Sequence, residues 1–175
     1  VYFSKLTAKW MLTDTQVGLI SGGYYAGYIL ATPILVRSTD IIDSRQVFIV
    51  GCLFTLSACL GFSFIASGFW TALIFWGLAG IGLAGTYMPG LQILNSRVNS
   101  DERVRIVPFY AAAFTIGTAV SFAIMSLISV TYEVSTAALI ASFSSIISLL
   151  IIFFLTSPQK PDNSPEIDRK KLNLC

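Results

Sequence analysis

The feature that most constrains the fold is a long stretch without charge. From Gln46 to Ser96, 51 consecutive residues contain no Asp, Glu, Lys or Arg. A single helix of this length would be about 75 Å long, whereas a helix that crosses a membrane needs only about 20 residues. The stretch must therefore fold back on itself, and Ser67-Gly68 is its best turn signal. We predict two membrane spans here, at about 47–67 and 70–95.

The rest of the chain follows the same pattern. Hydrophobic residues make up 55% of the 175 residues and charged residues only 11%, where a soluble domain carries about 25% charged residues. A soluble core of this size could not hide so much apolar surface. Three further uncharged runs predict spans at about 15–36, 106–130 and 135–157. The predicted class is an all-α integral membrane protein with five transmembrane helices.

Helix boundaries carry local signals. Phe3, Leu6 and Trp10 share one helical face, and Lys5 and Lys9 lie on another, which predicts a short interfacial helix at the amino end. The segment Thr13-Asp14-Thr15-Gln16 matches a capping box ahead of the first span. Asp43 is placed to cap the second span.

The basic residues indicate how the chain threads the membrane. With five crossings, one side collects nine Lys and Arg and the other only two, Lys5 and Lys9. The nine are Arg37, Arg45, Arg97, Arg103, Arg105, Lys160, Arg169, Lys170 and Lys171. Because cytoplasmic segments carry the excess of Lys and Arg, we expect the carboxyl-terminal tail in the cytoplasm. The expected location is a cell membrane of the bacterial inner-membrane kind.

Several kinds of site are disfavoured by composition. The chain has no His, and no predicted span contains a charged residue, so we expect no catalytic residues, no metal site and no cofactor. Cys52 and Cys59 lie about 10 Å apart along one predicted helix, too far for a disulfide. The net charge of +2 is too small to suggest a nucleic-acid partner.

The loop after the first span resembles a family signature. The major facilitator superfamily carries a charged pattern, roughly G-x-x-x-D-R-x-G-R-[RK], between its second and third helices. In VRSTDIIDSR, residues 36–45, Asp40 matches the aspartate and Arg45 the final basic position. Val36, Ile41, Asp43 and Ser44 depart from the pattern. QVGLISGGYYAGYILATP and GLAGTYMPG also look like the second and fourth helices of such proteins.

The resemblance implies an architecture and partners. Residues 1–157 would be a partial amino-terminal six-helix half that lacks most of its first helix, and 158–175 a truncated cytoplasmic linker between the halves. The expected partners are the missing first helix, the carboxyl-terminal half of the same carrier, the lipid bilayer and a small solute of unknown identity.

The same resemblance gives the loop a role. In carriers of this family the loop is thought to latch the two halves in the outward-open state, which would make Asp40 and Arg45 latch residues. A carboxylate at the end of a helix can meet the positive amino end of a helix in the other half. The alternative is that Arg37 and Arg45 only fix topology and Asp43 only caps the next helix.

Two stripes mark the predicted first span. Gly23, Gly27 and Ala31 form a small stripe suited to close helix packing. Tyr24, Tyr28 and Thr32 form a polar stripe about 100° away. Since the family binds substrate near the bilayer midplane between its halves, the polar stripe is a candidate for the substrate cavity. Each tyrosine has an alternative role as an interfacial anchor or packing residue.

Later spans repeat this division. Tyr87, Gln92 and Thr115 are further cavity candidates, and Gly82, Gly85 and Gly117 further packing candidates. The glycine density of the predicted span 70–95 lowers helix propensity by about 1 kcal/mol per residue in water, which favours either close packing or a helix that flexes.

Three function classes compete. The first is a secondary transporter that moves a small solute by alternating access. A membrane-embedded enzyme is disfavoured because no acid, base or His lies at depth. A non-transporting scaffold or receptor-like protein is the alternative, and only the polar stripes and the loop signature argue against it.

Overall fold

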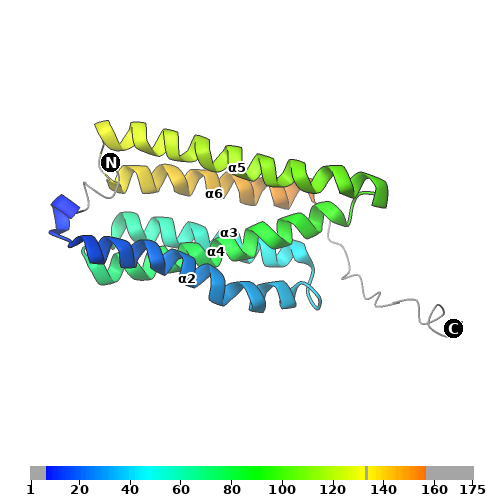
Figure 1. Cartoon of the computed structure of the whole chain (residues 1–175), viewed down its shortest axis with the longest axis horizontal. Helices are drawn as coiled ribbons and strands as arrows, with labels where there is room; N and C mark the ends of the chain where they lie inside the picture. Colours follow the sequence, from blue (N-terminus) through cyan, green and yellow to red (C-terminus); the bar gives the residue numbers. More distant parts are fainter. Residues whose placement is uncertain (1–6, 133, 157–175) are drawn as a thin grey trace, which may run out of the picture.

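Five long helices make up most of the described chain (Figure 1). The computed structural model describes residues 7–132 and 134–156. The helices are α2 (Asp14–Ser38), α3 (Ser44–Phe64), α4 (Phe69–Asn95), α5 (Ser100–Thr131) and α6 (Val134–Leu155). Each is long and apolar enough to cross a membrane. The predicted class of five membrane-spanning helices is therefore confirmed.

A short helical segment precedes α2. Residues 7–10 are helical, and Met11, at φ 49°, turns the chain toward α2. The Trp10 ring lies 6.2 Å from the ring of Phe62 on α3, so this segment packs on the bundle. The first six residues, with Phe3, Lys5 and Leu6 of the predicted interfacial helix, lie outside the described residues.

The predicted caps form. The backbone N–H of Gln16 donates to the Thr13 hydroxyl (3.3 Å), and the N–H of Thr13 donates to the Gln16 side-chain oxygen (3.0 Å). The Asp43 carboxylate accepts from the N–H of Arg45 (3.0 Å) and caps α3. These bonds satisfy amide groups that a helix start otherwise leaves without a partner, so both caps are confirmed.

Helix bounds differ from the predicted spans where the chain leaves the apolar region. Helix α3 ends at Phe64, before the predicted 67, and the turn is closed by the Thr71 hydroxyl, which accepts from the N–H groups of Ser67 and Gly68. Helix α5 begins at Ser100, six residues before the predicted 106. The predicted bounds follow the uncharged run, which starts after the last charged residue. Helix α5 begins before that run and includes the charged residues that precede it.

Helix α4 lies at the centre of the packing. It runs along both α2 and α3, and α3 also packs on α6. A Cβ at Gly27 would strike the carbonyl group of Gly77, and a Cβ at Gly51 would lie 2.6 Å from the carbonyl carbon of Gly85. The backbones of α2 and α3 therefore approach that of α4 more closely than side chains would permit.

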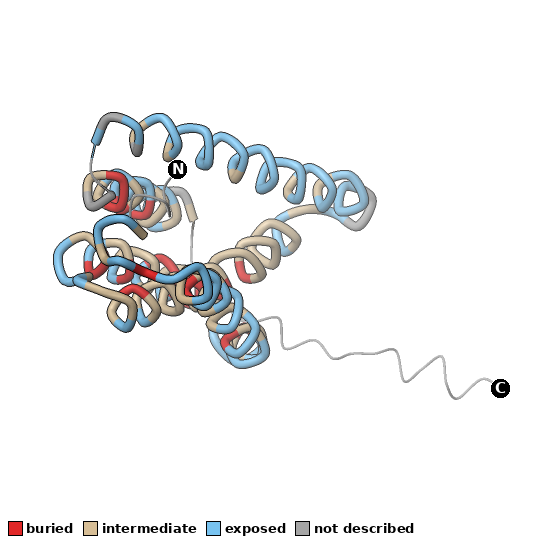
Figure 2. Tube along the Cα trace, turned by 60° about the vertical axis from the view of Figure 1, so that its left-hand side comes forward, coloured by how far each residue is buried: buried red, intermediate tan, exposed pale blue. Residues whose placement is uncertain are grey.

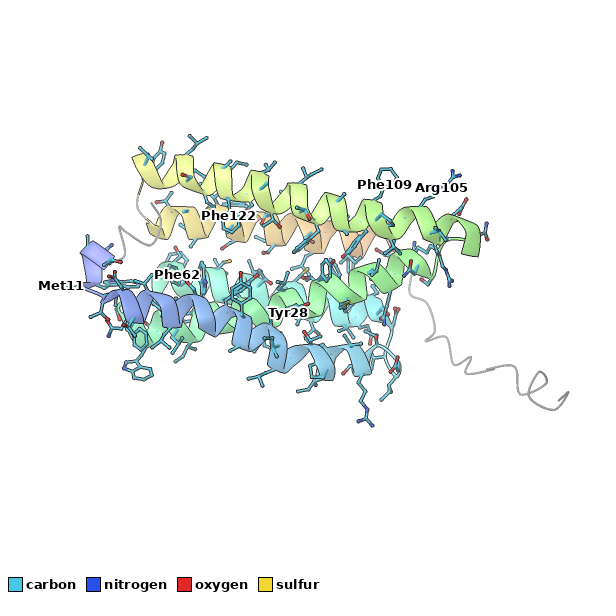
Figure 3. The ribbon with its side chains drawn as sticks, in the orientation of Figure 1. Met11, Tyr28, Phe62, Arg105, Phe109 and Phe122 are labelled. Carbon is cyan, nitrogen blue, oxygen red and sulfur yellow. The ribbon has the colours of Figure 1, made fainter. Side chains whose placement is uncertain are left out.

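Helix α5 is bound far less tightly. It touches α4 and α6 only lightly, and its apolar window contains no buried residue. Figure 2 shows it exposed along almost its whole length. Phe109 and Phe122 are 75% and 73% exposed and project from α5 in Figure 3. Water would not tolerate such a surface, whereas lipid or another apolar helix would cover it.

Candidate functional site

The polar stripe of α2 lies beside the crossing with α4. The Tyr24 ring is 5.5 Å from that of Tyr25 and 6.3 Å from that of Trp76 on α4. Tyr28 is partly buried, and its carbonyl accepts a 2.6 Å hydrogen bond from the Thr32 hydroxyl. The Thr32 hydroxyl is thus engaged with its own helix, and the two tyrosines are the available polar groups.

Tyr87 lies in a second place, between α4 and α5. Its ring is 4.7 Å from that of Phe114 and 5.7 Å from that of Tyr110. The Tyr110 hydroxyl donates to the Tyr87 carbonyl at 2.9 Å. A Cβ at Gly90 would lie 2.6 Å from the Tyr110 oxygen, so the absence of a side chain at Gly90 gives the phenol room. Tyr87 therefore belongs to the cluster that joins α5 to α4.

Gln92 and Thr115 lie apart from both groups. The Gln92 side-chain oxygen accepts a 3.0 Å hydrogen bond from the Ser44 hydroxyl, which ties the end of α4 to the start of α3. Thr115 is exposed, and its hydroxyl donates to the Ala111 carbonyl of its own helix at 2.9 Å. The six cavity candidates are thus distributed over several places and form no single site in the described chain.

The predicted packing glycines divide into two groups. Gly23, Gly27, Gly82 and Gly85 all lie where α4 crosses α2 or α3, and a Cβ on any of them would meet a neighbouring helix closer than 3.0 Å. Around Gly117, by contrast, the described structure has no atom within 4 Å of a Cβ. The packing role of Gly117 stays a prediction, because no other helix lies against that face of α5 in the described structure.

A cavity of about 440 Å³ opens between α3, α4, α5 and α6. Four aromatic rings line it, together with two sulfur-containing side chains, two serines and four alanines. The lining residues are Ala58, Cys59, Phe62, Phe75, Trp76, Ala79, Ser121, Phe122, Met125, Ser126, Ala138 and Ala141. None of the six predicted cavity residues is among them, although Tyr24 contacts Trp76 at its edge.

Sequence reasoning missed this cavity for a physical reason. Phe62, Phe75, Trp76 and Phe122 are apolar residues on three helices, α3, α4 and α5, that only the tertiary arrangement brings together. Within each helix they look like any lipid-facing or core residue.

The two predicted latch residues lie on either side of the start of α3, with Asp40 in the α2–α3 turn and Arg45 in the first turn of α3. Asp40 is exposed, and its N–H donates to the Arg37 carbonyl (3.2 Å). Arg45 forms no ion pair with Asp40 in the described part of the chain. Its Nη2 donates instead to the Phe153 carbonyl of α6 at 2.9 Å. The two candidates are thus separate, with Asp40 facing outward and Arg45 turned into the bundle.

The described residues offer packing and polar contacts. Within 7–132 and 134–156, no three of His, Cys, Asp and Glu gather as they would to hold a metal ion. The cavity is lined by rings, alanines, sulfur atoms and hydroxyls, which can hold apolar groups by contact. Such a lining offers a bound molecule an apolar contact surface, and its serine hydroxyls can orient that molecule by hydrogen bonds.

Comparison with protein families decides the class. The model of the family described as Major Facilitator Superfamily matches residues 1–174. The chain belongs to the major facilitator superfamily. No curated protein gives a significant match. The resemblance stated from the loop and the spans is confirmed, and with the five apolar helices it makes the chain an integral membrane protein of transporter type.

The loops of this superfamily chain alternate between the two ends of the bundle. Figure 1 places the α2–α3 and α4–α5 loops and the carboxyl end of α6 at one end, and the α3–α4 turn at the other. Arg105 and Met11 lie at these opposite ends in Figure 3. Arg105 therefore lies at the end that holds the α2–α3 and α4–α5 loops, which is the end to which the charge count assigns nine Lys and Arg.

Proposed function

We propose that this chain forms part of a secondary carrier that moves a small solute across a cell membrane by alternating access. The observation that carries the proposal is the family match over residues 1–174, joined to a bundle of five membrane-length helices. Such carriers work by movement of one helix bundle against another. The predicted spans lack charged residues, so any ion-coupling group would belong to another part of the carrier.

The proposed assembly includes segments beyond those described. It comprises a first helix and a carboxyl-terminal half of the same carrier, with the lipid bilayer around them and no nucleic acid. The exposed length of α5 leaves an apolar face that either lipid or an additional helix of this assembly would cover. The linker predicted at 158–175 lies outside the described residues.

We propose that the end holding the α2–α3 loop is cytoplasmic, in a membrane of the bacterial inner-membrane kind. The support is the predicted sorting of Lys and Arg, nine against two. Asp40 then stands exposed at the cytoplasmic end of α2, where it can meet a helix of the other half and favour the outward-open state.

The Asp40 role has its own test. Asp40→Asn in the full-length protein removes the charge but keeps the size of the side chain, so transport should fall about tenfold while membrane insertion is unchanged. Arg37→Gln is the matched control because it removes a charge nearby, in the last turn of α2. Transport by Asp40→Asn at the wild-type rate would remove Asp40 from the mechanism.

Uptake by the full-length protein tests the carrier proposal. Proteoliposomes with the purified protein would be incubated with pooled sugars, organic acids and amino acids, with and without a proton gradient. Mass spectrometry of the vesicle contents should show at least one solute that accumulates saturably. Vesicles without protein are the control. If a folded, correctly inserted protein accumulates none of the pools under either condition, a scaffold or receptor-like role is favoured.

A further inference from the structure

Arg45 connects two helices that are distant in sequence. It is the second residue of α3, and its Nη2 donates to the carbonyl of Phe153 in the last turn of α6 at 2.9 Å. Its guanidinium carbon also lies 5.5 Å from the centre of the Phe153 ring. The backbone N–H of Arg45 is held at the same time by Asp43, at 3.0 Å. One residue thus joins the capped start of α3 to the end of α6.

The chemistry of a helix end explains why this contact is favourable. The last carbonyls of a helix have no amide partner within the helix. The N–H that would reach the Phe153 carbonyl lies four residues on, beyond the end of α6 at Leu155. An arginine supplies a donor for this carbonyl and a positive charge at the negative end of the helix dipole. Stacking over the ring adds a cation–π attraction.

Asp40 does not share this arrangement. It is exposed in the α2–α3 turn and has no ion pair with Arg45 in the described part of the chain. Arg37, in the last turn of α2, is also exposed. Of the two arginines that flank this turn, Arg45 is therefore bound to another helix and Arg37 is not in the described structure, although the sequence presents both as topology charges.

We propose that Arg45 is a clamp that positions the carboxyl end of α6 against the start of α3, and that Asp40 acts separately from it. Figure 1 shows both helix ends at the same end of the bundle, beside the α2–α3 loop. A shift of this loop would therefore be transmitted to the point where the chain leaves α6. The clamp follows from the contacts alone and does not depend on transport being the function.

Hydrogen exchange of the full-length protein in lipid nanodiscs tests the clamp. Arg45→Leu should speed amide exchange in the last two turns of α6, residues 148–154, about tenfold, because a charge-assisted hydrogen bond is lost. Arg45→Lys, which keeps a cation and donors, should recover part of the protection. Arg37→Leu is the matched control and should exchange like the wild type in α6, as should Asp40→Asn.

Further readouts separate a clamp from general destabilisation. Phe153→Leu keeps the carbonyl and removes the ring, so it should speed exchange at the end of α6 less than Arg45→Leu does. Equal rates in Arg45→Leu and Arg37→Leu would overturn the clamp. So would faster exchange spread over α2 and α4, or an effect of Phe153→Leu as large as that of Arg45→Leu. These exchange rates test the clamp even if the protein transports no solute in the uptake experiment.

Discussion

Helices α4 and α5 are both apolar, both carry a proline and both contain glycine, yet they are held in opposite ways. Helix α4 buries Gly80, Gly82 and Gly85 against its neighbours, whereas the apolar window of α5 has no buried residue. The backbone of α4 is in contact with the backbones of two other helices. Helix α5 is joined to α4 through one phenol hydroxyl and a few rings.

This difference shows that an apolar composition determines whether a helix lies in the membrane, but it does not determine which helices pack against each other. A glycine permits close approach only where a second backbone is present to use it. At Gly27 that backbone is Gly77, and at Gly117 the described structure has none. Helix α5 is therefore the element whose environment depends most on lipid or on a further helix.

The largest expected effect is at the α2–α4 crossing. Gly27→Leu places a side chain where the backbone of Gly77 already lies, so the helices must separate, at a cost of at least about 2 kcal/mol. The folded fraction after detergent extraction, read by size-exclusion chromatography, should fall sharply. Gly18→Leu is the matched control, since a Cβ there has no neighbour within 4 Å in the described structure. Equal yields for the two variants would break the contrast between the helices.

A smaller effect is expected at the junction of α5 with α4. Tyr110→Phe removes the hydroxyl that donates to the Tyr87 carbonyl at 2.9 Å and keeps the ring contact. The loss should be about 1 kcal/mol and should appear as faster amide exchange in α5, with α2 and α3 unchanged. Thr118→Val is a useful control because the Thr118 hydroxyl bonds only its own helix, at Phe114. If Tyr110→Phe leaves α5 exchange unchanged, the hydroxyl is not what holds α5.

The smallest effect is expected at Gly117 in the 175-residue chain. Gly117→Leu adds a side chain to open space, so stability should change by no more than about 0.5 kcal/mol. The same substitution in the full-length protein sharpens the comparison. A large loss of folded yield there would show that another helix covers this face of α5, and an equally small effect would show that lipid covers it.

Much of the fold could be predicted because it depends on local patterns. Uncharged runs predicted five spans, the sequence around Thr13 predicted a capping box, and Asp43 was expected to cap α3; the structure confirms each. The bounds of α5 were less predictable, because a charged turn at Asn99–Glu102 continues the helix beyond the apolar run. The thickness of the membrane limits the length of the apolar run, whereas the helix itself can extend beyond the membrane.

The candidate site was less predictable because it depends on which helices meet. The stripe of Tyr24 and Tyr28 was visible by spacing, but the aromatic cavity brings together faces of four helices. The contact partner of Arg45 could likewise not be predicted from the sequence, since Phe153 lies 108 residues away. Side chains whose partners are distant carry no local signal of that partner.

The central claim is that these helices cross a bilayer and that their loops alternate between its two sides. Single cysteines placed at Ser67 and at Ser96, with Cys52, Cys59 and Cys175 replaced by Ala, mark the two ends of α4. In sealed right-side-out vesicles, a membrane-impermeant maleimide should label the cysteine at 67 at once and the cysteine at 96 only after the membrane is permeabilised. Labelling of both positions before permeabilisation would contradict the threading and, with it, the carrier proposal.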